Sequence, residues 1–297
     1  MARLKLKKDS IILAIPNGSL QEPTLRILEK ISIDISVGRK SMYEINLEGL
    51  HLIIRLMRPQ SIPITVLKGK AHLGITGWDW VVENKTDKKL KVITNLLYSK
   101  KTSGPVNIVV VCRAGSQVDK NRIIDTKSKT VYAEYPKIAK MVFKKAKIIF
   151  SHGSTEAEIS AGTYDYGVLL TETGESLEAD GLKIVKSIME SSTVLISKEE
   201  KEEYKTIGEL LTGVLKGRKY ETLKMNVPDG KISDILKILP SLGGPTTTKL
   251  TNTENSAENR SAIEVVVNKS LIPSLVIKLR KMGATGIFTQ DMNMLLE

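Results

Sequence analysis

The feature that most constrains this chain is an alternation between short apolar runs and amphipathic stretches. In the first part of the chain, apolar runs occupy residues 11–15, 50–57 and 72–75, and amphipathic stretches occupy residues 20–30 and 62–68. Alternating strands and helices are typical of α/β proteins, in which the connecting helices cover the sheet. We therefore predict an α/β fold.

A second set of apolar runs follows and predicts further α/β structure. After it, residues 198–219 form a charged stretch whose apolar residues share one helical face, which predicts an amphipathic helix. The strand candidates of this second set are residues 107–112, 130–133, 147–150, 166–170 and 193–197.

The pattern changes after residue 221 and predicts a separate small domain. The expected order is strand, helix, strand, strand, helix, strand, which is the ferredoxin-like split motif. Pro228 with Asp229 marks the start of the first helix, and Gly283 marks the end of the second. The six elements are expected at residues 222–227, 229–239, 246–251, 262–268, 270–282 and 286–290.

Composition excludes several classes of protein. Hydrophobic residues make up 41% of the 297 residues, which is typical of a folded chain. No stretch reaches the ~20 apolar residues of a membrane helix, and the run at residues 11–15 is too short for a signal peptide. We therefore expect a cytoplasmic protein without a membrane partner. The single cysteine, Cys112, lies in an apolar run, so we expect a buried, inert thiol.

The three histidines show no spacing typical of a metal site. His51 and His72 lie in or beside apolar runs and are expected to pack, whereas His152 precedes a Gly-Ser-Thr turn and fits either packing or a ligand role. A structural zinc site is not expected, and the sequence does not identify metal ligands.

The net charge of +12 favours a polyanionic partner. Nucleic-acid-binding proteins usually cluster their basic residues and add aromatic side chains for stacking. Here aromatic residues are only 4% of the chain, and the basic residues are spread along it. We therefore expect small phosphorylated ligands and no nucleic acid.

The most informative segment for chemistry is residues 166–181, where an apolar strand leads into a turn rich in Thr, Gly and Ser. A strand, a short turn and a helix start bring backbone amides and hydroxyl groups to one point, which can bind phosphate. Glu172 and Glu175 fit this turn if it also holds ribose hydroxyls or Mg²⁺. The alternative is an ordinary helix cap made by Thr173 or Ser176.

Three other strand ends carry similar turns. They contain Asn17, Gly18 and Ser19 in the first turn, Gly77 and Asp79 in the second, and Glu156 in the third. Each turn alone is a weak signal. Together, four such turns in one α/β region predict a phosphate-binding cleft at the carboxyl ends of parallel strands.

These segments, in this order, resemble the ATP phosphoribosyltransferases of histidine biosynthesis. The resemblance continues in the tail, through Gly244-Pro245-Thr246 and Lys281-Met282-Gly283-Ala284, which are similar to the histidine-sensing domain of the long form. It covers essentially the whole chain. The matching catalytic blocks are Pro16, Gly18 and Leu20; Arg58, Pro63, Gly69, Gly74, Gly77, Asp79 and Glu83; Gly153, Ser154 and Glu156; and Gly162, Asp165, Thr173, Gly174, Ser176 and Leu177.

The chain departs from the family pattern at four positions. Leu169 replaces a second acidic residue four after Asp165, and Asn17 and Ser19 replace a basic pair. His72 stands where an acidic residue is usual. These departures bear on the contacts of the ribose, the metal and the phosphates.

The resemblance implies an activity and an architecture. The activity is that of a glycosyltransferase of the pentosyltransferase class, which joins ATP to phosphoribosyl pyrophosphate with Mg²⁺ and without a covalent protein nucleophile. The architecture is two periplasmic-binding-protein-like α/β lobes, formed by residues 1–100 with 192–221 and by residues 101–191, and a ferredoxin-like (ACT-like) α+β regulatory domain at residues 222–297. Feedback inhibition by histidine and a homo-oligomer, from a dimer to a hexamer, are further expectations.

The resemblance also implies site residues. Arg55 and Arg58 fit either phosphate contacts or surface arginines, and Asp79 and Glu156 fit either ligand contacts or helix capping. The expected phosphoribosyl pyrophosphate site is Asp165, which supports the loop or the ribose, with Thr171, Glu172, Thr173, Gly174, Glu175 and Ser176. The expected ATP and substrate cleft is Asn17, Gly18, Ser19, Arg55, Gly77, Asp79 and Glu156, and the expected histidine site is Asn226, Leu242, Thr246 and Gly286.

Three other functions are compatible with parts of the sequence. One is a non-catalytic bilobal protein that binds small ligands, since this architecture does not require catalysis. Another is a nucleic-acid-binding protein driven by the positive charge. The third is a catalytically weakened paralogue that only regulates, with which the departures at Asn17, His72 and Leu169 are compatible.

Overall fold

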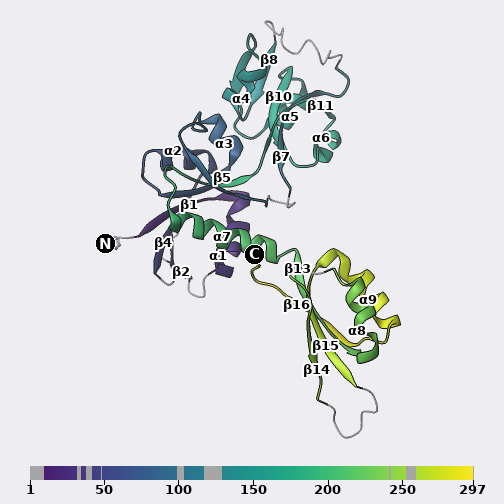
Figure 1. Cartoon of the computed structure of the whole chain (residues 1–297). Coiled ribbons are helices and arrows are strands. Elements are labelled where there is room, and N and C mark those ends of the chain that lie inside the picture. Colours follow the sequence, from purple (N-terminus) through teal and green to yellow (C-terminus); the bar gives the residue numbers. More distant parts are fainter. Residues whose placement is uncertain are drawn as a thin grey trace. The chain divides into compact units, whose positions relative to one another are not determined.

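The computed structural model describes residues 10–31, 35–37, 42–47, 49–98, 104–116, 129–240, 242–251 and 259–296. The chain forms two compact units, Met1–Glu209 and Leu210–Glu297. Figure 1 shows the elements of each unit along the chain. Within the described ranges the first unit contains two sheets and the second contains one.

The first sheet has seven strands in the order β2-β3-β4-β1-β5-β12-β6. β1 pairs in parallel with β4 and β5, and their central residues are almost fully buried. β12 then runs antiparallel to both β5 and β6. The strands are β1 (Ile11–Pro16), β2 (Ile35–Val37), β3 (Met42–Leu47), β4 (Leu50–Met57), β5 (Leu73–Gly77), β6 (Lys91–Leu96) and β12 (Thr193–Ser197).

Short helices connect the parallel strands of this sheet. They are α1 (Gln21–Ile31), α2 (Ile62–Leu67) and α3 (Trp78–Glu83), with single 3-10 turns at η1 (Gly18–Leu20) and η2 (Pro59–Ser61). α2 packs closely on β5. A Cβ added at Gly74 of β5 would lie only 2.5 Å from Ile62 Cγ2 of α2. Glycine therefore permits this close contact between helix and sheet.

The second sheet has five strands in the order β11-β7-β10-β8-β9. β8 is parallel to β9 and β10, whereas β7 is antiparallel to β10 and β11. The strands are β7 (Val106–Arg113), β8 (Thr130–Ala133), β9 (Lys147–Phe150), β10 (Tyr166–Thr171) and β11 (Leu182–Ser191), and the helices are α4 (Pro136–Val142), α5 (Thr155–Ala161) and α6 (Glu175–Ala179).

Cys112 is fully buried in β7, as predicted, and burial raises the pKa of its thiol. Leu169, one of the departures from the resembled pattern, is also buried. It packs with Val109, Val111 and Ile159 on one face of β10. Leu169 is therefore part of the hydrophobic core of the second sheet.

The chain passes between the two sheets after β6 and again at Ser192, between β11 and β12. The second crossing is a single residue. A hydrogen bond from Thr193 Oγ1 to the Tyr98 carbonyl, 2.8 Å long, joins the two crossing segments. This hydrogen bond therefore links the two segments that pass between the sheets, in addition to the covalent chain.

The second unit contains a ferredoxin-like domain, as predicted. Its sheet has the order β14-β15-β13-β16, and its two helices bury Leu223, Met225 and Val227 of β13 in a common core. α7 (Glu202–Gly217) precedes this domain and buries Ile207, as its apolar face predicts. The other elements are β13 (Tyr220–Pro228), η3 (Asp229–Lys231), α8 (Ile232–Ile238), β14 (Thr246–Lys249), β15 (Arg260–Asn268), η4 (Lys269–Leu271), α9 (Ile272–Lys281) and β16 (Thr285–Asp291).

Candidate active site

Residues of all four predicted turns line one cavity of about 300 Å³ in the first unit. The turns follow β1, β5, β9 and β10, which each belong to a parallel pair of strands. The cavity size lies within the range of small-molecule sites. Its lining residues are Asn17, Ser19, Leu20, Pro59, Gly77, Asp79, Trp80, Tyr98, Gly104, Val106, Glu134, Tyr135, Glu156, Leu170, Glu172, Ser191, Ser192 and Thr193.

The first turn presents small polar side chains. Asn17 and Ser19 are exposed and line the cavity, and Gly18 has a positive φ of 80°. A hydrogen bond from the Asn17 N–H to the Met57 carbonyl, 2.9 Å long, holds the turn beside the end of β4. This wall offers amide and hydroxyl groups.

The second turn holds a buried carboxyl group. Asp79 is only 2% exposed, and its Oδ1 accepts a 2.6 Å hydrogen bond from Ser191 Oγ. Oδ2 is also buried and makes no hydrogen bond of ordinary geometry within the described residues, although the Tyr135 hydroxyl is close enough to lower the pKa of Asp79. Burial raises the pKa of Asp79, and the hydrogen bond from Ser191 partly offsets this effect. A buried acceptor without a well-formed hydrogen bond is rare in proteins and marks a candidate ligand contact.

Gly77 makes room for that carboxyl group. Its φ of −72° suits any residue, but a Cβ there would be 2.1 Å from Asp79 Oδ1. The requirement for glycine is therefore steric. One oxygen of Asp79 bonds Ser191 in the crossing segment, and the carboxyl group also interacts with the Tyr135 hydroxyl.

The second sheet contributes two cavity residues that sequence reasoning missed, Glu134 and Tyr135. They follow β8, so the rule that selected the other strand ends also applies to this one. Burial, together with the negative charge of Glu156, raises the pKa of Glu134. Burial and the charge of Asp79 raise the pKa of Tyr135. This wall is acidic and includes Glu172 from the fourth turn.

The predicted phosphate loop is a tight turn between β10 and α6. The Gly174 N–H donates to Thr171 Oγ1 at 3.1 Å, and Gly174 has a φ of 83°. Glu172 lines the cavity, whereas Thr173, Glu175 and Ser176 are exposed side chains of the same turn. The loop thus begins at the cavity wall and continues along the surface.

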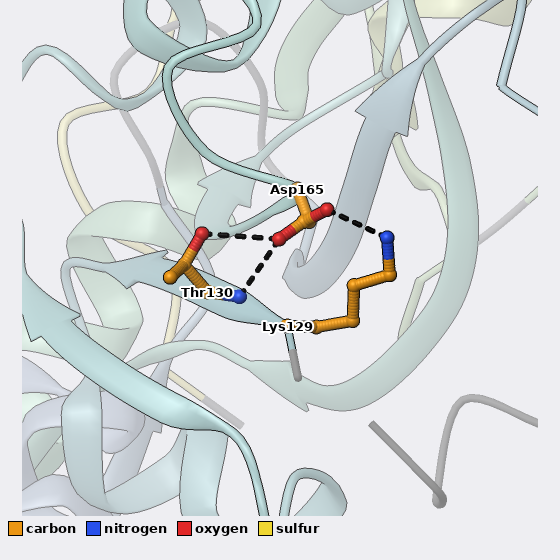
Figure 2. Close-up of polar contacts among 3 residues, drawn as sticks. All are labelled: Lys129, Thr130 and Asp165. Carbon is orange, nitrogen blue, oxygen red and sulfur yellow. Dashed lines mark hydrogen bonds and ion pairs between the residues drawn. The ribbon is translucent and has the colours of Figure 1, made fainter. Parts of the chain in front are cut away.

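Asp165 immediately precedes β10 and so lies at the opposite end of that strand from this loop, while its contact with the ribose stays a prediction. Figure 2 shows its carboxylate accepting hydrogen bonds from Lys129 Nζ (2.8 Å), the Thr130 N–H (2.8 Å) and Thr130 Oγ1 (3.1 Å). Partial burial acts to raise the pKa of Asp165, but these contacts together lower it. The separation arises because a strand places its two ends on opposite edges of the sheet.

The two arginine candidates lie at or just after β4 and are not part of the cavity lining. Arg55 is half-buried, and its Nη1 makes a long contact of 3.4 Å with the Lys70 carbonyl. Arg58 is exposed and immediately precedes Pro59, which does line the cavity.

His51 and His72 have hydrogen-bonding roles beside strands. His72 Nδ1 accepts from the Ile12 N–H at 2.8 Å, and burial lowers its pKa. His51 Nδ1 lies 2.8 Å from Ser10 Oγ. His152 packs edge-on against Phe150, with ring centroids 4.8 Å apart. Among the described residues no three His, Cys, Asp or Glu side chains form a group that could hold a metal ion.

The four candidates for the histidine site do not all lie together in the domain. Asn226 on β13 is adjacent to Gly286 on β16, because a Cβ at Gly286 would be 3.2 Å from Asn226 Nδ2. Thr246 lies on β14, which β15 separates from β13, and Leu242 precedes it in a loop. Nearby, Arg260 Nη2 donates to the Gly283 carbonyl at 2.9 Å.

Comparison with known proteins agrees with this combination of a two-sheet α/β unit and a ferredoxin-like tail. Residues 58–216 match the family model described as ATP phosphoribosyltransferase, and residues 217–294 match that described as HisG, C-terminal domain. The fold and the site thus belong to an enzyme of the pentosyltransferase class. The chain belongs to the ATP phosphoribosyltransferase family.

Curated relatives match over almost their whole length. The ATP phosphoribosyltransferase of Thermodesulfovibrio yellowstonii is 32% identical, covering 96% of this chain and 98% of the relative. That of Desulforudis audaxviator is also 32% identical, covering 95% and 97%. A solved structure of the ATP phosphoribosyl transferase (HisG:HisZ) complex from Thermotoga maritima is 22% identical, with a TM-score of 0.57 over 69% of this chain and 98% of that chain. The last likeness concerns the fold. Separately, no helix in the described part of the chain has the length and apolar character needed to span a membrane.

Proposed function

We propose that the cavity binds ATP and phosphoribosyl pyrophosphate and catalyses their condensation to N1-(5-phosphoribosyl)-ATP and pyrophosphate, the first step of histidine biosynthesis. The observation that carries this proposal is the meeting of all four strand-end turns around one cavity. Such turns present amides and hydroxyl groups to phosphates. Family membership supplies the reaction.

In this reaction the adenine N1 attacks the anomeric carbon as pyrophosphate leaves. The protein's task is to align two polyanionic substrates and to stabilise positive charge that develops at the ribose. We assign the 5-phosphate to the amides and hydroxyl groups of residues 171–176. We assign the ribose hydroxyls to Glu172, because a carboxylate accepts hydrogen bonds from them.

Asp79 is our candidate for a further ligand contact. It lines the cavity, and its buried Oδ2 makes no hydrogen bond of ordinary geometry among the described residues, so a ligand hydroxyl or amino group could bond it. Asn17, Gly18 and Ser19 are proposed to face the phosphates of ATP, with Gly77 and Glu156 at the adjoining walls. This turn lacks a basic side chain, so neutral donors would carry that contact.

Mg²⁺ is the proposed cofactor. It keeps several waters and binds through one or two carboxylates together with substrate phosphates. The cavity carboxylates therefore suit Mg²⁺ that arrives with phosphoribosyl pyrophosphate, and Glu172 and Glu156 are the residues that would hold it. When bound, the ion neutralises charge on the leaving pyrophosphate.

Regulation and assembly follow from the same family membership. We propose that residues 1–100 with 192–221 and residues 101–191 form the two catalytic lobes, and that residues 222–297 bind histidine as a feedback inhibitor. The adjacent Asn226 and Gly286 are the first residues to test for that site. We also propose a homo-oligomer, from a dimer to a hexamer, in the cytoplasm, where nucleotide substrates are available.

The test is a turnover assay with a matched pair of variants. Pure protein is incubated with ATP, phosphoribosyl pyrophosphate, Mg²⁺ and pyrophosphatase, and N1-phosphoribosyl-ATP is followed by ultraviolet absorbance with and without histidine. Glu172→Gln should lower kcat/KM about 10-fold or more. Glu178→Gln removes an exposed carboxylate on α6 and should leave it unchanged.

The possible outcomes separate the alternatives. Absence of product would contradict the enzyme and favour a non-catalytic or regulatory paralogue. Product formation without histidine sensitivity would remove only the regulatory proposal. Equal activity of the two glutamate variants would contradict the role of Glu172.

A further inference from the structure

Glu83 is a buried carboxylate whose position is not explained by contact with the cavity. It is the last residue of α3, in the layer of the seven-stranded sheet, and is 8% exposed. Its two oxygens accept the Lys137 N–H, each at 3.0 Å, and Oε2 also accepts the Ile138 N–H at 2.9 Å. Both amides belong to α4, in the layer of the five-stranded sheet.

This contact supplies a helix cap from outside the helix. The first N–H groups of a helix have no partner within it, and a carboxylate there is favoured by the helix dipole. α4 begins at Pro136, and its preceding residue makes no side-chain cap. Glu83 therefore satisfies amides that α4 itself leaves without acceptors.

The rest of α3 also contacts both layers. Val81 is buried in the core of the first sheet, whereas Trp80 and Val82 pack against the core of the second. The rings of Trp80 and Tyr135 lie 4.6 Å apart between centroids. One short helix thus contributes hydrophobic contacts to both layers, and Glu83 adds a directional polar contact.

The first turn of α3 is joined to the crossing segment. The Trp78 N–H donates to the Ser192 carbonyl at 2.9 Å, and Asp79 is bonded to Ser191. α3 is therefore held at its first turn by the crossing and at its last residue by α4. Two separate anchors restrict rotation of one layer against the other more than either anchor alone.

The segment fixed by Glu83 leads directly into the cavity wall. Glu134 and Tyr135 line the cavity and immediately precede α4. A shift of the α4 start would move both residues relative to Gly77 and Asp79, which lie in the other layer. The cavity geometry therefore depends on the Glu83 contact.

We propose that Glu83 is a positioning residue for phosphoribosyl transfer, which sets the separation of the two cavity walls by capping α4 from α3. This inference rests on the proposed function for its catalytic consequence. Reaction between two bound substrates is sensitive to alignment, and a misplacement of about 1 Å can cost about 100-fold in rate. Loss of the Glu83 contact should therefore lower kcat more than it changes KM.

The experiment compares Glu83→Gln with Glu209→Gln in the full-length protein. Glu209 is an exposed glutamate on α7, so the control makes the same chemical change away from the contact. For Glu83→Gln, kcat should fall about 10-fold or more while both KM values change by less than about threefold. Hydrogen exchange at the Lys137 and Ile138 amides should accelerate about 10-fold or more, because protection there depends on Glu83. Hydrogen exchange at the amides of β7 should be unchanged, and Glu209→Gln should match the wild type in every measurement.

A thermal melt of each variant confirms that assays are made well below unfolding. If Glu83→Gln does not fold, Glu83→Asp, which keeps the carboxylate but shortens its reach, is tested by the same measurements. Faster exchange with unchanged kcat would reduce Glu83 to a structural cap and overturn the proposal, as would unchanged exchange. An inactive wild type would instead contradict the proposed function, so the two failures are distinguishable.

Discussion

Ser191 Oγ donates a 2.6 Å hydrogen bond to Asp79 Oδ1 and accepts the Asp79 N–H at 2.9 Å. These two residues are 112 positions apart in the chain. Together they join the first turn of α3 to the end of β11, beside the point where the chain passes from one sheet to the other. Asp79 therefore bonds the end of β11 at the crossing and also lines the cavity.

Replacing Ser191 by alanine should destabilise the protein in a pH-dependent way. The change leaves the buried Asp79 carboxylate and its N–H without this partner, and the expected cost is about 2 kcal/mol in the free energy of unfolding at pH 7. Because the hydrogen bond lowers the pKa of Asp79, its loss should raise that pKa further.

The sign of the pH dependence follows from the raised pKa. Below 3.8, the ordinary pKa of Asp79, the group is protonated in the folded and unfolded states, so no charge is buried. As pH rises from 3.8 through the folded pKa, the folded state loses stability. Denaturant melts should therefore show a larger difference from wild type at pH 7 than at acidic pH. Ser187→Ala, an exposed change on the same strand, is the control; an equal difference at both pH values would contradict burial of the charge.

Gly77→Ala should displace the Asp79 carboxyl group without straining the backbone. The new Cβ would be 2.1 Å from Asp79 Oδ1, so we expect a loss of about 2 kcal/mol in stability and of about 10-fold or more in kcat/KM. In a double-mutant cycle with Asp79→Ala the two effects should not add, because the clash requires the carboxyl group. Gly115→Ala, where no atom lies within 4 Å of the added Cβ, is the control, and additive effects would contradict this mechanism.

Gly174→Ala tests the phosphate loop. A non-glycine residue at φ 83° is strained by about 1 kcal/mol, and the displaced amide should lower kcat/KM about 10-fold or more. Gly181→Ala imposes similar strain at φ 71° outside the loop. Both variants should lose similar stability in thermal melts, but only Gly174→Ala should lose activity. Equal kinetics would remove the loop from the substrate site.

Asp165→Asn should affect stability and leave catalysis nearly unchanged. The variant loses the ion pair with Lys129, and the expected cost at pH 7 is about 1 kcal/mol, because the pair is partly exposed. The lowered pKa of Asp165 means that its contribution is present above 3.8, the ordinary value, and is lost as pH falls through the folded pKa. Urea melts of the wild type and of Asp165→Asn, at pH 7 and at acidic pH, measure this contribution to stability. A large loss of kcat/KM would return Asp165 to the ligand site.

Several features were predictable because their signals are local. Apolar runs predicted β8, β9 and β12 with the observed bounds, and turn residues marked the start of the first helical segment of the ferredoxin-like domain, at Asp229, and the end of its second helix, before Gly283. β11 was missed because two register shifts interrupt its alternation of buried and exposed residues. A bulge removes the period of two on which strand prediction depends.

The sequence by itself determined the α/β class, the ferredoxin-like tail and the four turns, since each depends on neighbouring residues. Tertiary structure alone decided that Asp165 bonds Lys129 and Thr130, that Glu134 and Tyr135 join the cavity, and that Glu83 caps α4. These relationships depend on strand pairing and on contacts between residues far apart in the chain. Local patterns identify a turn or a carboxylate, but only the packed fold specifies what that group contacts.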